Sequence, residues 1–513
     1  MSDEKPLPKW LIPGLALFKL FIHLLTNTNY SFHRDEYLYL TEGLQPAWGY
    51  LEIPPLTAFI ASIIQFLGGS LFITRLFPAL IGGAMVWLIG KLVQALGGKT
   101  WAVVIACAAL IISPAFLRTH TLFQPVSFNQ FNWFLVGYLL VRLVQSQQGR
   151  YWYYLGIMAG IGMLTKYSIA FYLLSLFVAL LISRHRSWFG TRYPYLALLI
   201  ALVIASPNLL WQYTNGFPLF RHMEELRETQ LVNVSTIEFV LNQFLMNFSA
   251  SIVWIGGLIY LLRHRAASDF RFLGWAYLFT FGLLVFMSGK PYYLLGAYPI
   301  LFVFGGLAMT QWIRRESRQM VLAGTLVFFN LTSIPMGLPV FPLESMKKYC
   351  TFVSNYMGMG QLLVWEDGKS RPLPQDYADM VGWEEMARRV GKFYNSLTPE
   401  QQKDCLIWGG SYGHAGAMQH YREKYQLPDN IYSLSSSFVL WANPQADFKT
   451  QILVSDERFD SSEWYHQVDL VDSVRNADAR DPGYIYYRTD PKVDVKERWK
   501  QSIREVKAGY GIE

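Results

Sequence analysis

The stretch PYLALLIALVIASPNLLWQY, residues 194–213, decides the fold class of this chain because it carries no charged side chain. Twenty residues in helical conformation rise about 30 Å, which is the thickness of the hydrocarbon core of a bilayer. Similar apolar runs recur on both sides of this stretch, from Trp10 to about Leu338. The pattern predicts a polytopic α-helical membrane protein.

The apolar runs define about eleven candidate transmembrane helices. The run Pro55–Gly68 is shorter and could either span the membrane or lie in its interface. If it lies in the interface, Lys5, Lys9 and the later clusters of Lys and Arg all fall on one side, as the positive-inside rule requires. We therefore expect a cytoplasmic N-terminus and an outer C-terminal region. The predicted spans are 10–27, 73–96, 101–117, 127–145, 151–165, 168–183, 194–213, 244–262, 272–288, 294–313 and 319–337.

Composition separates a second region from the membrane region. The chain is 52% hydrophobic and 16% charged, whereas soluble proteins carry about 25% charged residues. From about Glu344 the sequence resembles that of a soluble protein, with helix-like and strand-like segments in alternation. We predict two domains, a transmembrane domain over 1–340 and a soluble α/β domain over 341–513.

The charge, the cysteines and the N-terminus exclude several classes of protein. A net charge of +7 fits cytoplasmic loops rich in Lys and Arg. The sequence contains no stripe of basic residues with aromatic residues between them, so it does not indicate nucleic-acid binding. Cys107 lies in an apolar run, whereas Cys350 and Cys405 lie in the soluble region and could pair. No zinc spacing is present, and Trp10–Thr26 is interpreted as a retained span, not a cleaved signal peptide.

Acidic residues gather in the first loop predicted to lie outside. Asp35 and Glu36 are adjacent there, and Glu52 precedes two prolines. Taken by themselves, these residues are explained as caps of short helices, because acids are favourable at helix N-termini. A functional interpretation of the pair needs further support.

Two lysines fall on the outer side, against the positive-inside trend. Lys166 and Lys290 each follow a long apolar run, and a cation in that place calls for an anionic partner such as a lipid phosphate. The same argument applies more weakly to Arg75 and Arg118. Lys19 and His23 lie in the first span, where packing or snorkelling is the expected role.

Seven motifs occur in an order that resembles one known family. Together with SYGHAGAMQHY and LPDNIYSLSSSFVLW in the soluble region, they are similar to the family 39 glycosyltransferases, the protein O-mannosyltransferase-like branch of the GT-C membrane transferases. The resemblance runs from about Phe18 to Leu307 and matches bacterial members with an outer C-terminal domain. The seven motifs are HRDEYLYL, GYLEIPPL, RLFPAL, LFQPVSFNQFNW, GMLTKYS, SPNLLWQ and GKPYYLLGAYP.

The resemblance implies a membrane enzyme that moves one hexosyl or pentosyl unit from a polyprenyl-phosphate donor to an acceptor hydroxyl. The acceptor is a lipid, a glycan or a protein, and no cofactor or metal is implied. Asp35 would be the general base, with Glu36 beside it. Cations at Lys166, Lys290 and Arg75 would hold the donor phosphate. Tyr292 and Tyr293 would add hydrogen bonds, and Glu52 and Asn129 would line the acceptor or donor site.

Two departures from the family pattern bear on this interpretation. Many relatives carry a basic residue where this chain has Ile53, and many carry an aspartate where it has Asn129. The first departure puts the mode of phosphate binding in doubt, and the second puts the acceptor in doubt. The resemblance places the enzyme in the cell inner membrane, with its C-terminal domain in the periplasm.

Three rival functions stay open at this stage. A flippase or transporter of lipid-linked sugars would also be polytopic, and a binding protein descended from transferases would explain Asn129. The segment 409–413 matches G-x-S-x-G between a strand and a helix, the context of a serine hydrolase with Ser411 as nucleophile. The small size of the domain argues against hydrolysis, and no clear Asp-then-His pair follows Ser411, since His466 is the main histidine downstream.

Overall fold

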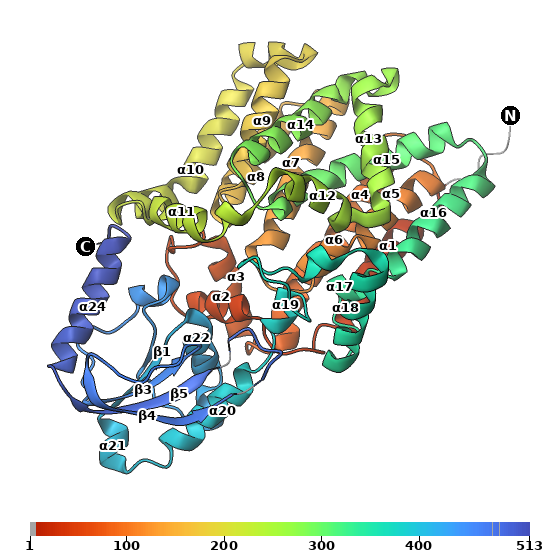
Figure 1. The fold of residues 1–513 in the computed structure, drawn as a ribbon. Helices are drawn as coiled ribbons and strands as arrows, with labels where there is room; N and C mark the ends of the chain where they lie inside the picture. Colours follow the sequence, from red (N-terminus) through yellow and green to blue (C-terminus); the bar gives the residue numbers. More distant parts are fainter. Residues whose placement is uncertain (1–6, 475, 482, 513) are drawn as a thin grey trace. The chain divides into compact units, whose positions relative to one another are not determined.

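The computed structural model describes residues 7–474, 476–481 and 483–512, and Figure 1 traces the chain. Lys5, which entered the prediction of topology, lies outside the described residues. The chain is mostly helical and forms two compact units. Unit 1 comprises Met1–Asn29, Phe72–Asn208 and Thr229–Phe341, and unit 2 comprises Tyr30–Leu71, Leu209–Glu228 and Pro342–Glu513.

The long helices of unit 1 follow the apolar runs of the sequence, and at least one helix overlaps each of the eleven predicted spans. The predicted boundary between two domains at residue 340 is not tested by this grouping into units, so it stays a prediction. The helices are α1 Leu11–Leu24, α4 Leu71–Ala95, α5 Thr100–Ile112, α6 Pro114–Thr119, α7 Pro125–Ser146, α8 Arg150–Thr165, α9 Ile169–Leu181, α10 Tyr193–Thr214, α12 Thr236–Asn247, α13 Ser251–Arg263, α14 Arg271–Phe286, α15 Tyr298–Trp312, α16 Glu316–Leu331 and α17 Ile334–Gly337.

Fewer helices than predicted meet a strict test for crossing a membrane. Within the described residues, five helical stretches are long and apolar enough, or six if α9 and the following turn Arg184–Gly190, bent by 103°, form one span. Several others are short, such as α5 with 13 residues, which rise only about 20 Å. The count of eleven spans is therefore not confirmed.

Glycines let the central helices of unit 1 approach closely. A Cβ atom at Gly257 of α13 would lie 2.0 Å from the Leu301 carbonyl oxygen, and one at Gly305 of α15 would lie 2.1 Å from that of Val253. Small residues at such crossings are typical of helices that pack in membranes. Nearby, the ring of Trp133 on α7 stacks on Tyr172 of α9, with centroids 4.7 Å apart.

The basic residues of the first span are buried in unit 1. Lys19 donates a hydrogen bond from Nζ to the Phe116 carbonyl at 3.2 Å, and the Nδ1 atom of His23 lies 3.2 Å from the Thr121 hydroxyl. Both side chains are fully buried. Packing, not snorkelling, therefore describes their place in this structure.

Unit 2 begins with two short helices, α2 Arg34–Leu44 and α3 Leu56–Phe66. The two helices pack closely on each other, and the Ser62 hydroxyl of α3 donates a hydrogen bond to the Gly43 carbonyl of α2 at 2.6 Å. The 11 residues of α3 rise only about 16 Å, which is too short to cross a bilayer. The further helices of this unit are α11 Pro218–Thr229, α18 Leu343–Met357, α19 Gln375–Ala378, α20 Trp383–Tyr394, α21 Pro399–Lys403, α22 Tyr412–His420, α23 Arg422–Tyr425 and α24 Val495–Gly509.

The C-terminal part of unit 2 contains a five-stranded mixed sheet, which confirms the predicted small α/β domain. The order is β2-β1-β3-β5-β4; β1 runs parallel to β2 and β3, whereas β5 is antiparallel to β3 and β4. Strand β2 was not predicted, since it has only two residues. The strands are β1 Cys405–Gly409, β2 Ile431–Tyr432, β3 Thr450–Ser455, β4 Tyr465–Ser473 and β5 Tyr484–Pro491.

The closing helix α24 covers this sheet with an apolar face. Trp499 is fully buried against Trp408 of β1, with ring centroids 5.6 Å apart, and its indole donates to the Asn443 carbonyl at 2.9 Å. The cysteines do not add a covalent link. Cys350 and Cys405 are free and buried, so the pairing left open by the sequence does not form.

Candidate functional site

The predicted catalytic pair lies at the first turn of α2, which His33 caps. The His33 imidazole Nδ1 accepts from the backbone N–H of Asp35 at 3.1 Å, and the His33 N–H donates to Glu36 Oε2 at 2.8 Å. This reciprocal capping box satisfies N–H groups that the helix leaves unpaired. The two acids differ in exposure, because Glu36 is fully buried in the cap whereas 29% of the Asp35 side chain is exposed.

The Asp35 carboxylate lies among hydrogen-bond donors and cations of unit 2. Tyr412, the first residue of α22, donates its hydroxyl to Asp35 Oδ1 at 2.8 Å. Burial by itself would raise the pKa of Asp35, but the Tyr412 hydroxyl, Arg34 and Arg480 oppose the rise, and the pKa lies below its ordinary value. Asp35 is therefore ionised at neutral pH and able to accept a proton.

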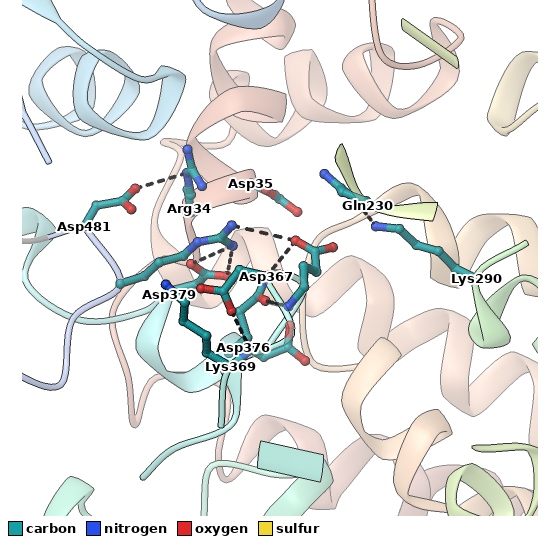
Figure 2. A network of polar contacts seen from close by, with 12 residues as sticks. Arg34, Asp35, Gln230, Lys290, Asp367, Lys369, Asp376, Asp379 and Asp481 are labelled. Carbon is teal, nitrogen blue, oxygen red and sulfur yellow. Dashed lines mark hydrogen bonds and ion pairs between the residues drawn. The ribbon is translucent and has the colours of Figure 1, made fainter. Parts of the chain in front are cut away.

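Arg34 links α2 to the C-terminal part of the same unit. Its guanidinium lies over the ring of Tyr412, 4.5 Å from the centroid, and its Nε is 3.4 Å from Asp481 Oδ2 (Figure 2). Its backbone N–H donates to the Asp379 carbonyl at 2.9 Å. Three contacts thus hold this residue, and they also fix the backbone next to Asp35.

Two further acids lie close to His33, and no sequence motif indicated either of them. The His33 Nε2 atom lies 3.7 Å from Asp376 Oδ1 and 3.6 Å from Asp379 Oδ2. Burial raises the pKa of Asp379, although Arg480 and Arg34 oppose the rise. Arg480 holds the Asp379 carboxylate at 3.2 Å.

Glu52, predicted to line the acceptor or donor site, is bonded to Ser437 in the short turn Ser436–Leu440. Its carboxylate accepts from the Ser437 N–H at 2.7 Å and from the Ser437 hydroxyl. The neighbouring Glu42 is fully buried, and burial followed by the proximity of Glu52 raises its pKa well above the usual range. In this structure Glu52 therefore attaches the loop after α2 to the C-terminal part of unit 2.

The predicted phosphate-binding lysines lie in unit 1, next to the two predicted tyrosines. The Lys166 ammonium is 4.9 Å from the ring centroid of Tyr293 and 5.2 Å from that of Tyr292. Lys290 lies 6.0 Å from the Tyr292 centroid and donates to Gln230 Oε1 (Figure 2). Ring faces attract ammonium groups, so the tyrosines hold these cations in place.

A narrow pocket opens beside these residues, and Asn129 belongs to its wall. The Asn129 amide donates to Ser168 Oγ at 3.2 Å and accepts from the Trp133 indole at 3.1 Å. Arg75 is instead fully buried and donates to the Asn27 carbonyl at 2.9 Å, so the structure does not group it with the pocket. The pocket is lined by Val126, Asn129, Gln130, Lys166, Tyr292, Tyr293 and Gly296.

Ser411 has the contacts of a helix cap. Its hydroxyl accepts from the His414 backbone N–H at 3.4 Å and lies 3.1 Å from His414 Nδ1. His466 lies on β4 with an exposed side chain. Among the described residues, no group of three or more His, Cys, Asp or Glu side chains is arranged to hold a metal ion.

Comparison with known proteins confirms the resemblance drawn from the motifs. Residues 52–211 match the family described as dolichyl-phosphate-mannose-protein mannosyltransferase. This segment includes Glu52, Asn129 and Lys166 but not Asp35. No curated protein matches the sequence significantly.

The fold is similar to that of two solved structures of one protein. The chain is similar to the crystal structure of ArnT from Cupriavidus metallidurans bound to undecaprenyl phosphate, with a TM-score of 0.59 and 16% identity. The apo structure of the same protein gives a TM-score of 0.59 and 17% identity. In both comparisons the similarity covers 93% of this chain and 97% of ArnT. The chain therefore shares the fold of ArnT, and its C-terminal part contains a small sheet.

Proposed function

We propose that this chain is a membrane glycosyltransferase that moves one sugar from a polyprenyl-phosphate donor to an acceptor hydroxyl. One observation carries the proposal: Asp35, in a segment that resembles the family's acidic pair, is partly exposed and held in its ionised form by the Tyr412 hydroxyl and the charge of Arg34. The polyprenyl-phosphate class of donor is supported by the undecaprenyl phosphate bound to ArnT.

In the proposed reaction the acceptor oxygen attacks the anomeric carbon of the donor sugar. The bond between that carbon and the phosphate oxygen breaks, and the electron pair leaves with the polyprenyl phosphate. The acceptor hydroxyl gives its proton to Asp35 as the new bond forms, because a neutral hydroxyl is a weak nucleophile. Glu36 keeps the first turn of α2 in place through its cap.

The leaving phosphate gains negative charge, so preorganised cations lower the barrier. We assign this role to Lys166 and Lys290, whose positions Tyr292 and Tyr293 fix. Arg75 is a weaker candidate, because its guanidinium is buried and bonded to Asn27. Asn129, with its amide engaged by Ser168 and Trp133, is assigned to the pocket wall and not to proton transfer.

We further propose eleven spans, α3 as an interfacial helix, and a reaction on the outer face of the inner membrane with the C-terminal domain in the periplasm. The one-sided clusters of Lys and Arg support this topology. A reporter that is active only outside the cytoplasm, fused after the last residue, should be active. Activity of a cytoplasmic reporter at the same site would reject the topology.

The proposed base is tested by Asp35→Asn in the purified full-length protein. This substitution keeps the shape of the side chain and removes its ability to take a proton. The rate of transfer from a supplied polyprenyl-phosphate sugar should fall by roughly 10²–10⁴-fold. Affinity for the donor should hold, because the phosphate is assigned to lysines.

Two results would count against the proposal. A near wild-type rate in Asp35→Asn would remove Asp35 from the mechanism and make Glu52 the next carboxylate to test. Transport of the lipid-linked sugar by the wild-type protein without any transfer product would favour the flippase class instead.

A further inference from the structure

The segment Gly409–Gly416 joins β1 to α22 and carries the motif that suggested a hydrolase. Its glycines have a structural reason to be there. A Cβ atom at Gly413 would lie 2.8 Å from Arg34 Cγ and 2.7 Å from the ring of Trp383, and one at Gly416 would lie 2.8 Å from Tyr37 Cβ. Both glycines therefore let α22 approach the first turns of α2, where Asp35 lies.

This close approach places one polar side chain of α22 against the proposed base. Tyr412 donates its hydroxyl to Asp35 Oδ1 at 2.8 Å, and Arg34 covers its ring at 4.5 Å. Arg34 is in turn held by Asp481 at 3.4 Å. The tyrosine ring is thus fixed in place, and its hydroxyl has a defined direction.

We infer that Tyr412 is a positioning residue for sugar transfer, which fixes the direction of the Asp35 carboxylate through its hydroxyl. The inference rests on the proposed function, since it takes Asp35 to be the base. It makes the C-terminal region part of the transferase and explains the G-x-S-x-G match without hydrolysis. Ser411 caps the helix, and the tyrosine that follows it makes the functional contact.

The chemistry of Tyr412 suits this role. Burial, opposed by Arg34 and reinforced by Asp35, raises the pKa of Tyr412 well above its usual range, so its hydroxyl stays a donor throughout the physiological pH range. A carboxylate held by a fixed donor keeps one orientation while the acceptor approaches, and preorganisation of this kind removes a cost from the reaction step. The hydrogen bond also stabilises the ionised form of Asp35 over the protonated form.

The pH profile of Tyr412→Phe gives a readout that a merely structural role would not change. Asp35 is faced by His33 and Arg34 from its own helix, and by Asp379, Arg480 and Tyr412 from the C-terminal part of unit 2. Loss of the hydroxyl removes one of the influences that lower the Asp35 pKa and leaves burial, which raises it. The acidic limb of the rate profile should therefore move to higher pH.

The experiment compares Tyr412→Phe with Tyr425→Phe in the purified full-length protein. Tyr425 lies on the neighbouring helix α23, and its hydroxyl donates to Glu384 at 2.8 Å, so its loss is a matched control. In Tyr412→Phe the kcat should fall about tenfold or more, the typical effect of losing a hydrogen bond to a charged group, with little change in KM for the donor. Tyr425→Phe should keep both the rate and the pH profile.

The double variant Asp35→Asn, Tyr412→Phe separates failure of this inference from failure of the proposed function. If Tyr412 acts through Asp35, its loss should add no further decrease in the Asp35→Asn background. A wild-type rate in Asp35→Asn would overturn the proposed base itself. A large loss in Asp35→Asn, with an unchanged rate and acidic limb in Tyr412→Phe, would overturn only the positioning role. Because each pH profile is normalised to its own maximum, a low yield of folded Tyr412→Phe does not change the position of the acidic limb, which therefore decides the test if the folded fraction falls.

Discussion

The two units hold their buried polar side chains in different ways. In unit 1, Asn129 bonds to a serine and an indole, and Lys166 lies against two aromatic rings. In unit 2, charged side chains meet directly, as Arg34 meets Asp481 and Arg480 meets Asp379. Unit 1 therefore depends mainly on close packing, whereas unit 2 depends on a charged network around α2. Substitutions at the packed glycines of unit 1 should affect folding first, and substitutions in the charged network around α2 should affect the rate and its pH dependence.

The largest effect is expected from Gly257→Ala in unit 1. The added methyl group would lie 2.0 Å from the Leu301 carbonyl oxygen and 2.8 Å from the Gly305 nitrogen, so the backbones of α13 and α15 must separate. The protein should be destabilised by about 3 kcal/mol or more, at the upper end of overpacking costs. Thermal unfolding and size-exclusion chromatography in detergent measure the loss.

Gly324→Ala is the matched control for this substitution. Gly324 lies on α16 of the same unit, and a Cβ atom there meets nothing within 4 Å. Since alanine is favoured over glycine in a helix interior, this variant should be as stable as the wild type or slightly more stable. Equal melting temperatures for the two variants would contradict the view that helix packing dominates unit 1.

The sequence predicted unit 1 better than it predicted the surroundings of the site. Apolar runs place helices well, because burial in lipid demands continuous stretches of apolar residues that are helical. They do not fix the number of spans, because helices such as α5 are short and α7 begins with the polar segment PVSFNQFN. Lys166 and the two tyrosines of the pocket were found through short motifs that lie close to the membrane ends.

The network around Asp35 could not be predicted in the same way. Tyr412 is 377 residues away from Asp35 in the sequence, and Asp379 and Arg480 lie in loops without a periodic pattern. Contacts of this kind come from tertiary packing, which local propensity does not encode. One signal was available for Tyr412, since the Tyr-Gly and Ala-Gly pairs belong to the motif shared with the family. A shared motif by itself does not show that Tyr412 contacts Asp35.

An intermediate effect is expected from Lys166→Gln, which tests whether the aromatic-held cations of unit 1 bind the donor. The substitution removes the charge and keeps much of the side-chain length. Affinity for polyprenyl phosphate should fall about 10- to 100-fold, the loss typical of a charge-assisted hydrogen bond. Calorimetric titration of the purified protein measures it.

Lys91→Gln provides the comparison for Lys166→Gln. Lys91 also lies over an aromatic ring in unit 1, 5.7 Å from the centroid of Trp87, but its side chain is exposed and remote from the pocket residues in sequence. Its loss should leave the affinity unchanged. If both variants weaken binding equally, the effect comes from general surface charge, and Lys166 has no special place in the donor site.

The smallest effect is expected from Ser411→Ala in unit 2. This substitution removes a neutral hydroxyl next to the charged network around α2 and leaves every charged side chain of that network in place. The hydroxyl caps α22 at 3.4 Å from the His414 nitrogen, so its loss should cost about 1 kcal/mol of stability. Sugar transfer should stay nearly unchanged, because Tyr412 and Gly413 keep their contacts with α2.

Ser411→Gly should cost only a few tenths of a kcal/mol, since glycine is also tolerated at this cap position. A loss of transfer of more than about a hundredfold in both variants, with normal folding, is the size of effect that follows removal of a group acting in the transition state. That result would return Ser411 to the chemistry and would show that the cap contact does not account for the serine.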